Sequence, residues 1–345
     1  MTVSGFSVTR WTRASIAVAI SGAVVLFCMA FLPFIAGPAT LDRITTLFIY
    51  VILAATWNAL AGYGGLVSIG QQAFFGLGAY ITIRLSNQDV NVYLAVLAAP
   101  LAVALVSLVL SFPMLRLKAG EFAVGMWVVA ELFHLAVNLD PLIQGETGTS
   151  LIALNAYGVG QRNALTFWIA LAAVATVLLG LFVLLRSGTG AALQAVRDNE
   201  DAADSIGVRV LSVKRIVFVF AAVGAAIAGS LWLASSISFQ PKTYFSVQWT
   251  SYMIFMVLVG GLGTFEGAII GAVIFYAIEG AFGGAGVWYM IGLGAVALLF
   301  SLFMPRGIYG MIGLHTGLQL LPVGYRLRAA QSEPAMKRQR KAAEA

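Results

Sequence analysis

Residues 94–115 read LAVLAAPLAVALVSLVLSFPML and carry no charged side chain. A helix needs about 20 mostly apolar residues to cross the hydrocarbon core of a bilayer, so this stretch predicts a membrane-spanning helix. Further long apolar runs lie at 16–35, 45–61, 165–185, 216–233 and 287–303. Shorter or glycine-interrupted runs lie at 67–83, 122–137, 250–262 and 268–282. The sequence therefore predicts an all-α, polytopic transmembrane helical bundle of about ten segments (roughly eight to ten).

The composition excludes most other classes of protein. The chain has 345 residues, of which 60% are hydrophobic and 10% are charged, and its mean hydropathy is +0.93. Soluble domains carry about a quarter charged residues, and disordered chains carry still more charge, so both classes are excluded. Because Cys28 is the single cysteine and only His134 and His315 could add imidazole ligands, we expect no disulfide framework and no metal site. No catalytic constellation stands out, so we expect no enzyme.

The placement of Lys and Arg residues orients the predicted bundle. If all ten segments cross and the N-terminus is cytoplasmic, most basic residues lie inside, in accord with the positive-inside rule. Both termini are then cytoplasmic: a short stretch at 1–13, and a basic tail at 315–345 beyond a permease domain at 14–314. The first apolar run exceeds the roughly 7–15 residues of a signal-peptide core, so we expect a retained helix. The basic residues left outside are Arg43, Arg84, Arg162 and Lys242.

Two loops between segments are long enough for recognition, an external one at 138–163 and a cytoplasmic one at 186–214. Within the second, residues 192–210 read ALQAVRDNEDAADSIGVRV. An apolar stripe followed by an acidic turn predicts two short amphipathic helices, of which the second ends at Gly207. This element is either a solvated loop or a docking element that offers a small-residue face, made by Ala202, Ala203 and Gly207, to a soluble partner.

Several stretches, in order, resemble a known family. Asp201-Ala202-Ala203 followed by Gly207 resembles the Glu-Ala-Ala…Gly loop of ABC-importer permeases, with Asp in place of Glu. More specifically, the chain resembles the inner-membrane permeases of branched-chain amino-acid ABC transporters, in particular the longer of the two permeases. The resemblance covers roughly residues 41–313. The matching stretches are NALAGYGGLVSIGQQAFFGLGAY at 58–80, LRLK at 115–118, the loop at 192–210, VGGLGTFEGAIIGA at 259–272 and PRG at 305–307.

The resemblance implies a permease that moves amino acids, above all branched-chain ones, inward across a prokaryotic plasma (inner) membrane. It implies a second permease subunit, two P-loop ATPase subunits and an extracytoplasmic solute-binding protein as partners. The chain itself has no G-x-x-x-x-G-K-[ST] motif, so we expect no cofactor in it and ATP use only by partner subunits. No nucleic-acid partner is expected. The candidate ATPase-coupling residues are Asp198, Glu200, Asp201, Ala202, Ala203 and Gly207.

The external loop leaves the substrate open. Thr147, Gly148, Thr149 and Ser150 resemble the family's TGGSDG and are candidate external contacts, but Leu151-Ile152 replace its Asp-Gly. Permeases for urea, short amides or aromatic acids therefore remain alternatives.

Polar residues and glycines inside the predicted segments are further candidates. Glu131 and His134 share a helical face at i, i+3 and would pair, either as a packing lock or as part of a pathway. An ion-gradient-driven secondary transporter that uses Glu131 remains an alternative function. Gly267 and Gly271 form a G-x-x-x-G that permits close helix crossing. The remaining candidates, for helix breaks or a pathway, are Asn58, Gly70, Gln71, Gln72, Gly260, Gly261 and Thr264.

Overall fold

The computed structural model of the chain describes residues 2–3, 6–9, 13–304, 306–316 and 326–329. Most of the predicted basic tail and about half of the predicted N-terminal stretch lie outside these residues. The described chain is a helical bundle, and eight of its helical stretches are long and apolar enough to cross a membrane. The prediction of a polytopic helical bundle is confirmed. The long helices are α1 (Arg13–Ala30), α2 (Pro38–Asn58), α4 (Val92–Met114), α5 (Ala119–Asn138), α6 (Val159–Arg186), α9 (Val210–Ser236), α12 (Phe265–Phe282) and α13 (Val287–Phe303).

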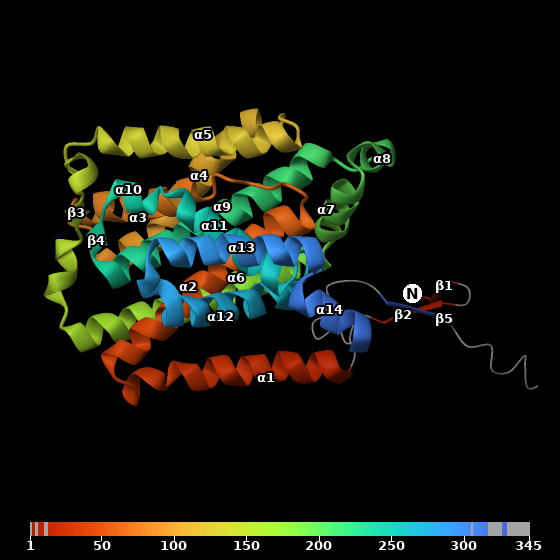
Figure 1. The fold of residues 1–345 in the computed structure, drawn as a ribbon, viewed down its shortest axis with the longest axis horizontal. Helices are drawn as coiled ribbons and strands as arrows, with labels where there is room; N and C mark the ends of the chain where they lie inside the picture. Colours follow the sequence, from red (N-terminus) through yellow and green to blue (C-terminus); the bar gives the residue numbers. More distant parts are fainter. Residues whose placement is uncertain (1, 4–5, 10–12, 305, 317–325, 330–345) are drawn as a thin grey trace, which may run out of the picture.

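The two ends of the bundle carry different elements (Figure 1). One end holds α7 (Gly188–Asp198) and α8 (Glu200–Ser205), which we call the α7–α8 knob. The opposite end holds the paired strands β3 (Thr149–Ser150) and β4 (Ser238–Phe239). This second end, the β3–β4 end, also carries the one-turn helices η1 (Leu32–Phe34), η3 (Gly145–Thr147), η4 (Ile152–Ala156) and η5 (Gly283–Ala285).

Two further crossings are only partly helical, because α3 (Gln72–Ser86) and α11 (Val247–Gly260) are short. α2 continues into a π-helical turn, η2 (Ala59–Tyr63), after which residues 64–71 form no regular helix. Gly65 lies against Arg197 of the knob, whereas Ser86 lines a cavity with Thr149 at the opposite end. The chain from 64 to 86 therefore crosses the bundle, and we call it the α3 crossing.

The α3 crossing corrects the predicted helix at 67–83, which begins only at Gln72. Glycines at 64, 65 and 70 disfavour helix. Most of the irregular stretch 64–71 is buried by protein, although Gly65 and Val67 are exposed, and irregular chain at membrane depth is tolerated where protein or a water-filled cavity surrounds it.

The second broken crossing, the α11 crossing, runs from 237 to 260. It begins with β4 and the single turn α10 (Pro241–Tyr244), which dips into the bundle: the rings of Tyr244 and Phe75 lie 5.7 Å apart, and Phe245 lies against Gly76. α11 then continues to Gly260, near the knob. With the two broken crossings, the described part of the chain crosses the bundle ten times, as the hydropathy pattern predicts.

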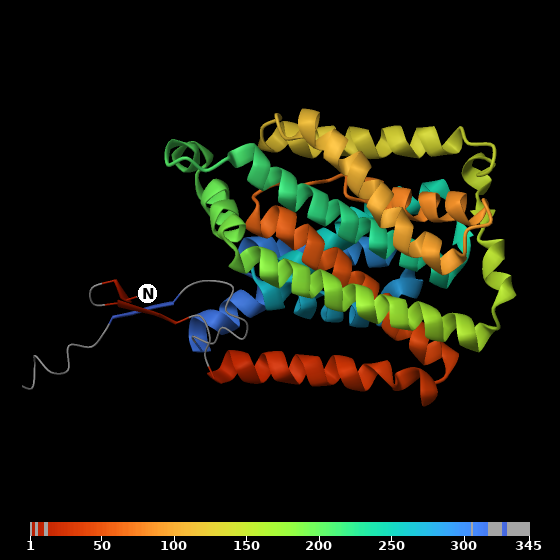
Figure 2. The same ribbon diagram turned by 180° about the vertical axis from the view of Figure 1, so that it is seen from behind.

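A small terminal sheet was not predicted. β2 (Phe6–Thr9) pairs antiparallel with β1 (Thr2–Val3) and with β5 (Arg326–Ala329), so residues from both ends of the chain lie together outside the bundle, on the side of the knob (Figures 1 and 2). α14 (Gly307–Thr316) lies at the same end. An even number of crossings places both ends of the chain on the same side of the bundle, as observed.

The broken crossings lie in the middle of the bundle, and α1 and α5 lie at its opposite flanks (Figures 1 and 2). α3 packs most extensively on α9, whose residues Ala222, Ala225 and Ala226 are fully buried. Small residues at such contacts allow helix backbones to approach, which matters because lipid supplies no hydrophobic drive for association between helices. α1 and α5 instead expose most of their side chains.

Candidate functional site

The α7–α8 knob has the local structure that its sequence predicts. The Asn199 side chain accepts a hydrogen bond from the Ala202 N–H (3.0 Å), and Glu200 and Asp201 occupy the first turn of α8, where negative charge favours the helix dipole. Gly207, with φ of +86°, follows the end of α8. The two short helices and their acidic turn are therefore confirmed.

The surface of the knob differs from the expected small-residue face. Ala203 is only 2% exposed and packs with Val196 and Val210, so its inclusion in that face was wrong. Its place is taken by Ile206, a large apolar side chain that is 78% exposed. Glu200 forms an ion pair with Lys214 and so fastens the knob to α9. The exposed residues of the knob and of the turn after it are Gly188, Ala191, Arg197, Asp198, Asn199, Glu200, Asp201, Ala202, Asp204, Ser205, Ile206 and Gly207.

Asn58 joins the ends of two crossings beside the knob. Its buried side chain donates to the Thr264 carbonyl and accepts from the Gly263 N–H, both at 2.8 Å. The turn that ends α2 thereby meets the loop between α11 and α12, more than 200 positions later in the chain. The structure brings together three predicted candidates here, Asn58, Gly261 and Thr264, since Gly261 lies against Thr264.

Close packing between α11 and α12 explains why glycine occupies positions 260 and 271. A Cβ on Gly271 would lie 1.7 Å from the Met256 carbonyl oxygen, and one on Gly260 would lie 1.9 Å from the Gly267 carbonyl oxygen. The expected close crossing at Gly267 and Gly271 is confirmed, and its partner is α11. The loop 261–264 that follows separates α11 from α12, so this region is both a packing point and a helix break.

A polar group lies where the two broken crossings meet inside the bundle. The Thr250 hydroxyl donates to the Gln72 carboxamide oxygen, and the rings of Phe75 and Trp249 lie 4.2 Å apart. Gly70 lies against the backbone of Met126 in α5. The carboxamide of the neighbouring Gln71 is buried and has no hydrogen-bond partner in the described part of the chain. A pathway role for these residues stays a prediction.

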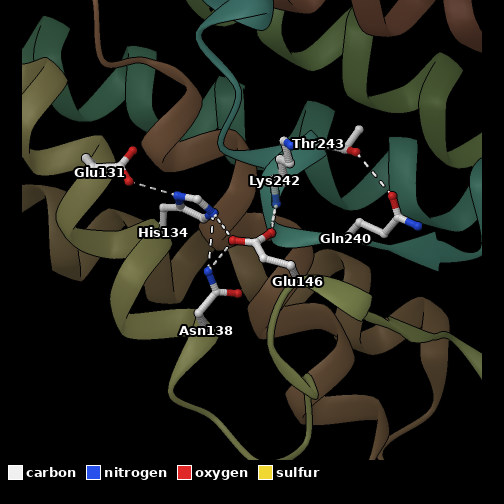
Figure 3. Close-up of polar contacts among 7 residues, drawn as sticks. All are labelled: Glu131, His134, Asn138, Glu146, Gln240, Lys242 and Thr243. Atoms are coloured by element: carbon white, nitrogen blue, oxygen red, sulfur yellow. Dashed lines mark hydrogen bonds and ion pairs between the residues drawn. The ribbon is translucent and has the colours of Figure 1, made fainter.

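The β3–β4 end carries a second polar cluster, centred on His134 (Figure 3). His134 Nδ1 lies 3.1 Å from Glu131 Oε1, and His134 Nε2 lies 2.8 Å from Glu146 Oε1. Asn138 Nδ2 donates to Glu146 Oε1, and the Lys242 N–H donates to Glu146 Oε2 (3.0 Å). The predicted pairing of Glu131 with His134 is confirmed. Glu146 was not predicted, because it reaches the cluster from the turn η3 and no helical spacing relates it to α5.

This cluster fastens the external loop to the bundle. Glu146 connects α5 to the start of the α11 crossing through its contact with Lys242 (Figure 3). Each ring nitrogen of His134 has a carboxylate neighbour, and a protonated imidazole can donate to both. Burial alone would raise the pKa of Glu146, but the hydrogen bond from Asn138 and the adjacent His134 outweigh it and lower that pKa below its usual range.

Glu131 marks the outer face of α5 as unusual. Its side chain is 57% exposed and lines a hollow of about 460 Å³ with Trp127, Val128, Leu132 and Leu135. A carboxylate at membrane depth is costly against lipid, so a face that presents one is expected to meet protein or water.

The candidate external contacts are built into the loop itself. Thr149 and Ser150 form β3, Gly148 is buried beneath the Phe239 carbonyl, and Thr147 is exposed. Thr149 and Ser150 also line a cavity of about 340 Å³ beside Ser86 and Asn87. Their contact with a partner stays a prediction.

Comparison with known proteins identifies the kind of chain that carries these sites. The family model described as "Branched-chain amino acid transport system / permease component" matches residues 39–312. The high-affinity branched-chain amino acid transport system permease protein LivM of Salmonella typhimurium is 27% identical, over 85% of this chain and 77% of its own. The guanosine ABC transporter permease protein NupQ of Bacillus subtilis is 23% identical, over 69% of this chain and 78% of its own.

Among solved structures, a putative metal-chelate type ABC transporter in an inward-facing conformation is 14% identical, with a TM-score of 0.47, over 87% of this chain and 96% of its own. The family model spans all but one of the ten crossings, and the members of this family are transport subunits of the inner membrane. The chain belongs to the family of branched-chain amino acid transport permeases and is a multi-pass ABC transporter permease.

Proposed function

We propose that the chain is the permease subunit of a binding-protein-dependent importer that moves branched-chain amino acids inward. Separate ATPase subunits use ATP and dock on the α7–α8 knob, which then faces the cytoplasm. A second permease completes the pathway, and a solute-binding protein delivers substrate at the β3–β4 end. The outer face of α5, with its exposed Glu131, is the surface that we assign to the second permease.

The observation that carries this proposal is the knob. It stands outside the membrane-spanning bundle, presents Asp201 and Ile206 to solvent, and is joined to α9 through the ion pair of Glu200 with Lys214. A large apolar side chain such as Ile206 is better accommodated in a protein interface than in contact with water, and the acidic residues around it can pair with basic groups of a partner.

Reconstitution tests the proposal. The chain, its second permease, both ATPases and the binding protein are placed in proteoliposomes, and uptake of labelled leucine is measured with and without ATP. We expect uptake that needs ATP and every partner. Inward movement without ATP, driven by an ion gradient in the purified chain alone and abolished by Glu131→Gln, would favour a secondary transporter instead.

The substrate is tested in the same vesicles. NupQ is named as a guanosine permease, so related permeases serve solutes other than amino acids. Competition by unlabelled leucine, isoleucine and valine, but not by guanosine, urea, acetamide or benzoate, is the expected result. Competition by one of the other solutes alone would reassign the substrate and leave the ATP-driven mechanism in place.

A further inference from the structure

Besides the ion pair of Glu200 with Lys214, an arginine side chain links the knob to the membrane segments. Arg197, in the last turn of α7, donates from Nη1 to the Gly62 carbonyl oxygen at 2.9 Å. Its Nε and Nη2 both donate to Asp198 Oδ1, at 3.0 and 2.8 Å, which orients the guanidinium. The planar fork of Arg therefore connects the acidic turn of the knob to the backbone of the bundle.

The backbone that Arg197 contacts is the point where α2 unwinds. Gly62 lies in the π-helical turn η2, and Gly65, with φ of +68°, lies against the stem of Arg197: a Cβ there would be 3.1 Å from Arg197 Cγ. π-helical turns and left-handed glycines are weak points of a helix at which it can bend. Arg197 thus holds the start of the α3 crossing.

The same turn reaches the second broken crossing. A Cβ on Gly62 would lie 2.5 Å from the Gly263 nitrogen, and Asn58 binds both Gly263 and Thr264. A displacement of the turn at Gly62 is therefore carried to the loop that ends α11. The crossings that meet at Gln72 and Thr250 inside the bundle are both connected to Arg197 at the knob.

A cleft borders the knob beside its contact with the turn at Gly62. This cleft, of about 590 Å³, separates the knob from the α4–α5 turn at 115–118, and Arg197, Gly64 and Gly65 line it. The contacts of the knob with α9, through Lys214, and with the turn, through Arg197, border this cleft on different sides.

We propose that Arg197 is the positioning residue that transmits movement of the docked knob to the broken α3 and α11 crossings. The proposal rests on the proposed function, because it needs ATPases that pull on the knob. Without Arg197 the ATPases still dock on the exposed acidic edge, but their movement no longer reaches Gly62. ATP hydrolysis then continues, whereas transport is lost.

The test measures ATP hydrolysis and leucine uptake in the same proteoliposomes of the complete complex. For Arg197→Gln we expect co-purification of the ATPases and continued hydrolysis, with uptake per ATP roughly tenfold lower, as for a lost coupling between sites. Arg197→Lys keeps a donor within reach of Gly62 and is expected to restore much of the uptake. Arg209→Gln removes an exposed arginine just beyond the knob and is the matched control, expected to behave as wild type.

Equal loss of hydrolysis and uptake in Arg197→Gln, or unchanged uptake per ATP, would overturn the role of Arg197. Failure of Arg197→Lys to restore any uptake in an assembled complex would also overturn it. Absence of ATP-driven uptake in the wild-type complex is a different result, which counts against the proposed function itself.

Discussion

The two ends of the bundle fasten the broken crossings in different ways. At the knob end, Asn58 and Arg197 bind backbone groups of glycine-rich turns, and glycines permit contacts that any Cβ would block. At the β3–β4 end, strand pairing and the close approach of Gly148 to Phe239 are joined by a cluster of the ionisable side chains Glu131, His134 and Glu146. Two of these three side chains are about half exposed. The contacts made by Asn58 and by the glycines at the knob end are therefore a fixed fit, whereas the His134 cluster is held by partly exposed ionisable groups.

The energetics of the two ends differ accordingly. Buried hydrogen bonds whose loss leaves a partner unsatisfied cost about 1–3 kcal/mol each, whereas exposed ion pairs contribute about 0.2–1 kcal/mol. The hydrogen bonds of Asn58 are therefore expected to contribute more than the ion pairs of the His134 cluster.

The largest effect is expected when a side chain is added to a closely packed glycine near the knob end. In Gly271→Val the new side chain collides with the Met256 carbonyl, and overpacking costs of about 1–3 kcal/mol or more prevent the crossing of α11 and α12. Gly280→Val, on the same helix with nothing within 4 Å, is the control. We expect little monodisperse protein from membranes for the first and a normal yield for the second. Equal yields would contradict the fixed fit.

The next largest effect is expected when the hydrogen bonds of Asn58 to the 261–264 loop are removed. Asn58→Ala leaves the Gly263 N–H and the Thr264 carbonyl without their partner, at a cost of about 1–3 kcal/mol. Hydrogen exchange of a peptide that covers 261–264 is expected to accelerate, whereas Asn155→Ala, at an exposed position of η4, leaves it unchanged. Identical exchange in both variants would show that the loop is held by other contacts.

A smaller effect is expected at the β3–β4 end. The double-mutant cycle of His134→Ala with Glu146→Ala should give a coupling energy of about 0.2–1 kcal/mol in unfolding experiments on detergent-solubilised protein. A coupling energy larger than the loss of unfolding free energy in Asn58→Ala would contradict the view that the contacts at the β3–β4 end are the weaker ones.

The smallest effect concerns pH. The pKa of Glu146 is lowered in the folded protein, so its stabilising contribution is fully present above the ordinary glutamate pKa of about 4.3 and is lost as pH falls through the lowered value. The difference in unfolding temperature between wild type and Glu146→Gln should therefore be largest near neutral pH and shrink in acid. A difference that grows on acidification would contradict the sign of this shift.

Much of the architecture could be predicted from the sequence. Apolar runs locate the crossings, because a bilayer demands them, and the acidic turn at Asp198–Asp201 locates the knob, because helix starts favour Asn and acidic residues. The glycine-rich stretch at 64–71 also signals a break, although the position at which helix resumes, Gln72, depends on packing against α5 and α9.

The rest depends on contacts between distant parts of the chain. Nothing local relates Asn58 to Gly263, or Glu146 to His134, since each pair is set by how the crossings pack. Local pattern also misplaced Ala203: the small residue that suits an open face turned inward, and Ile206 turned outward. Helical periodicity over one short turn is too brief to decide which side is buried.

The central claim, that the knob receives an external motor, is tested most directly by the double variant Asp201→Lys with Ile206→Asp. It reverses the charge and removes the apolar side chain of the exposed edge, and it leaves the left-handed Gly207 and the buried Ala203 intact. Asp42→Lys, an equivalent exposed change at the start of α2, is the control. The account predicts that the double variant reaches the membrane normally but loses both bound ATPases and ATP-driven leucine uptake, while Asp42→Lys keeps both. Undiminished ATP-driven uptake in the double variant would contradict it.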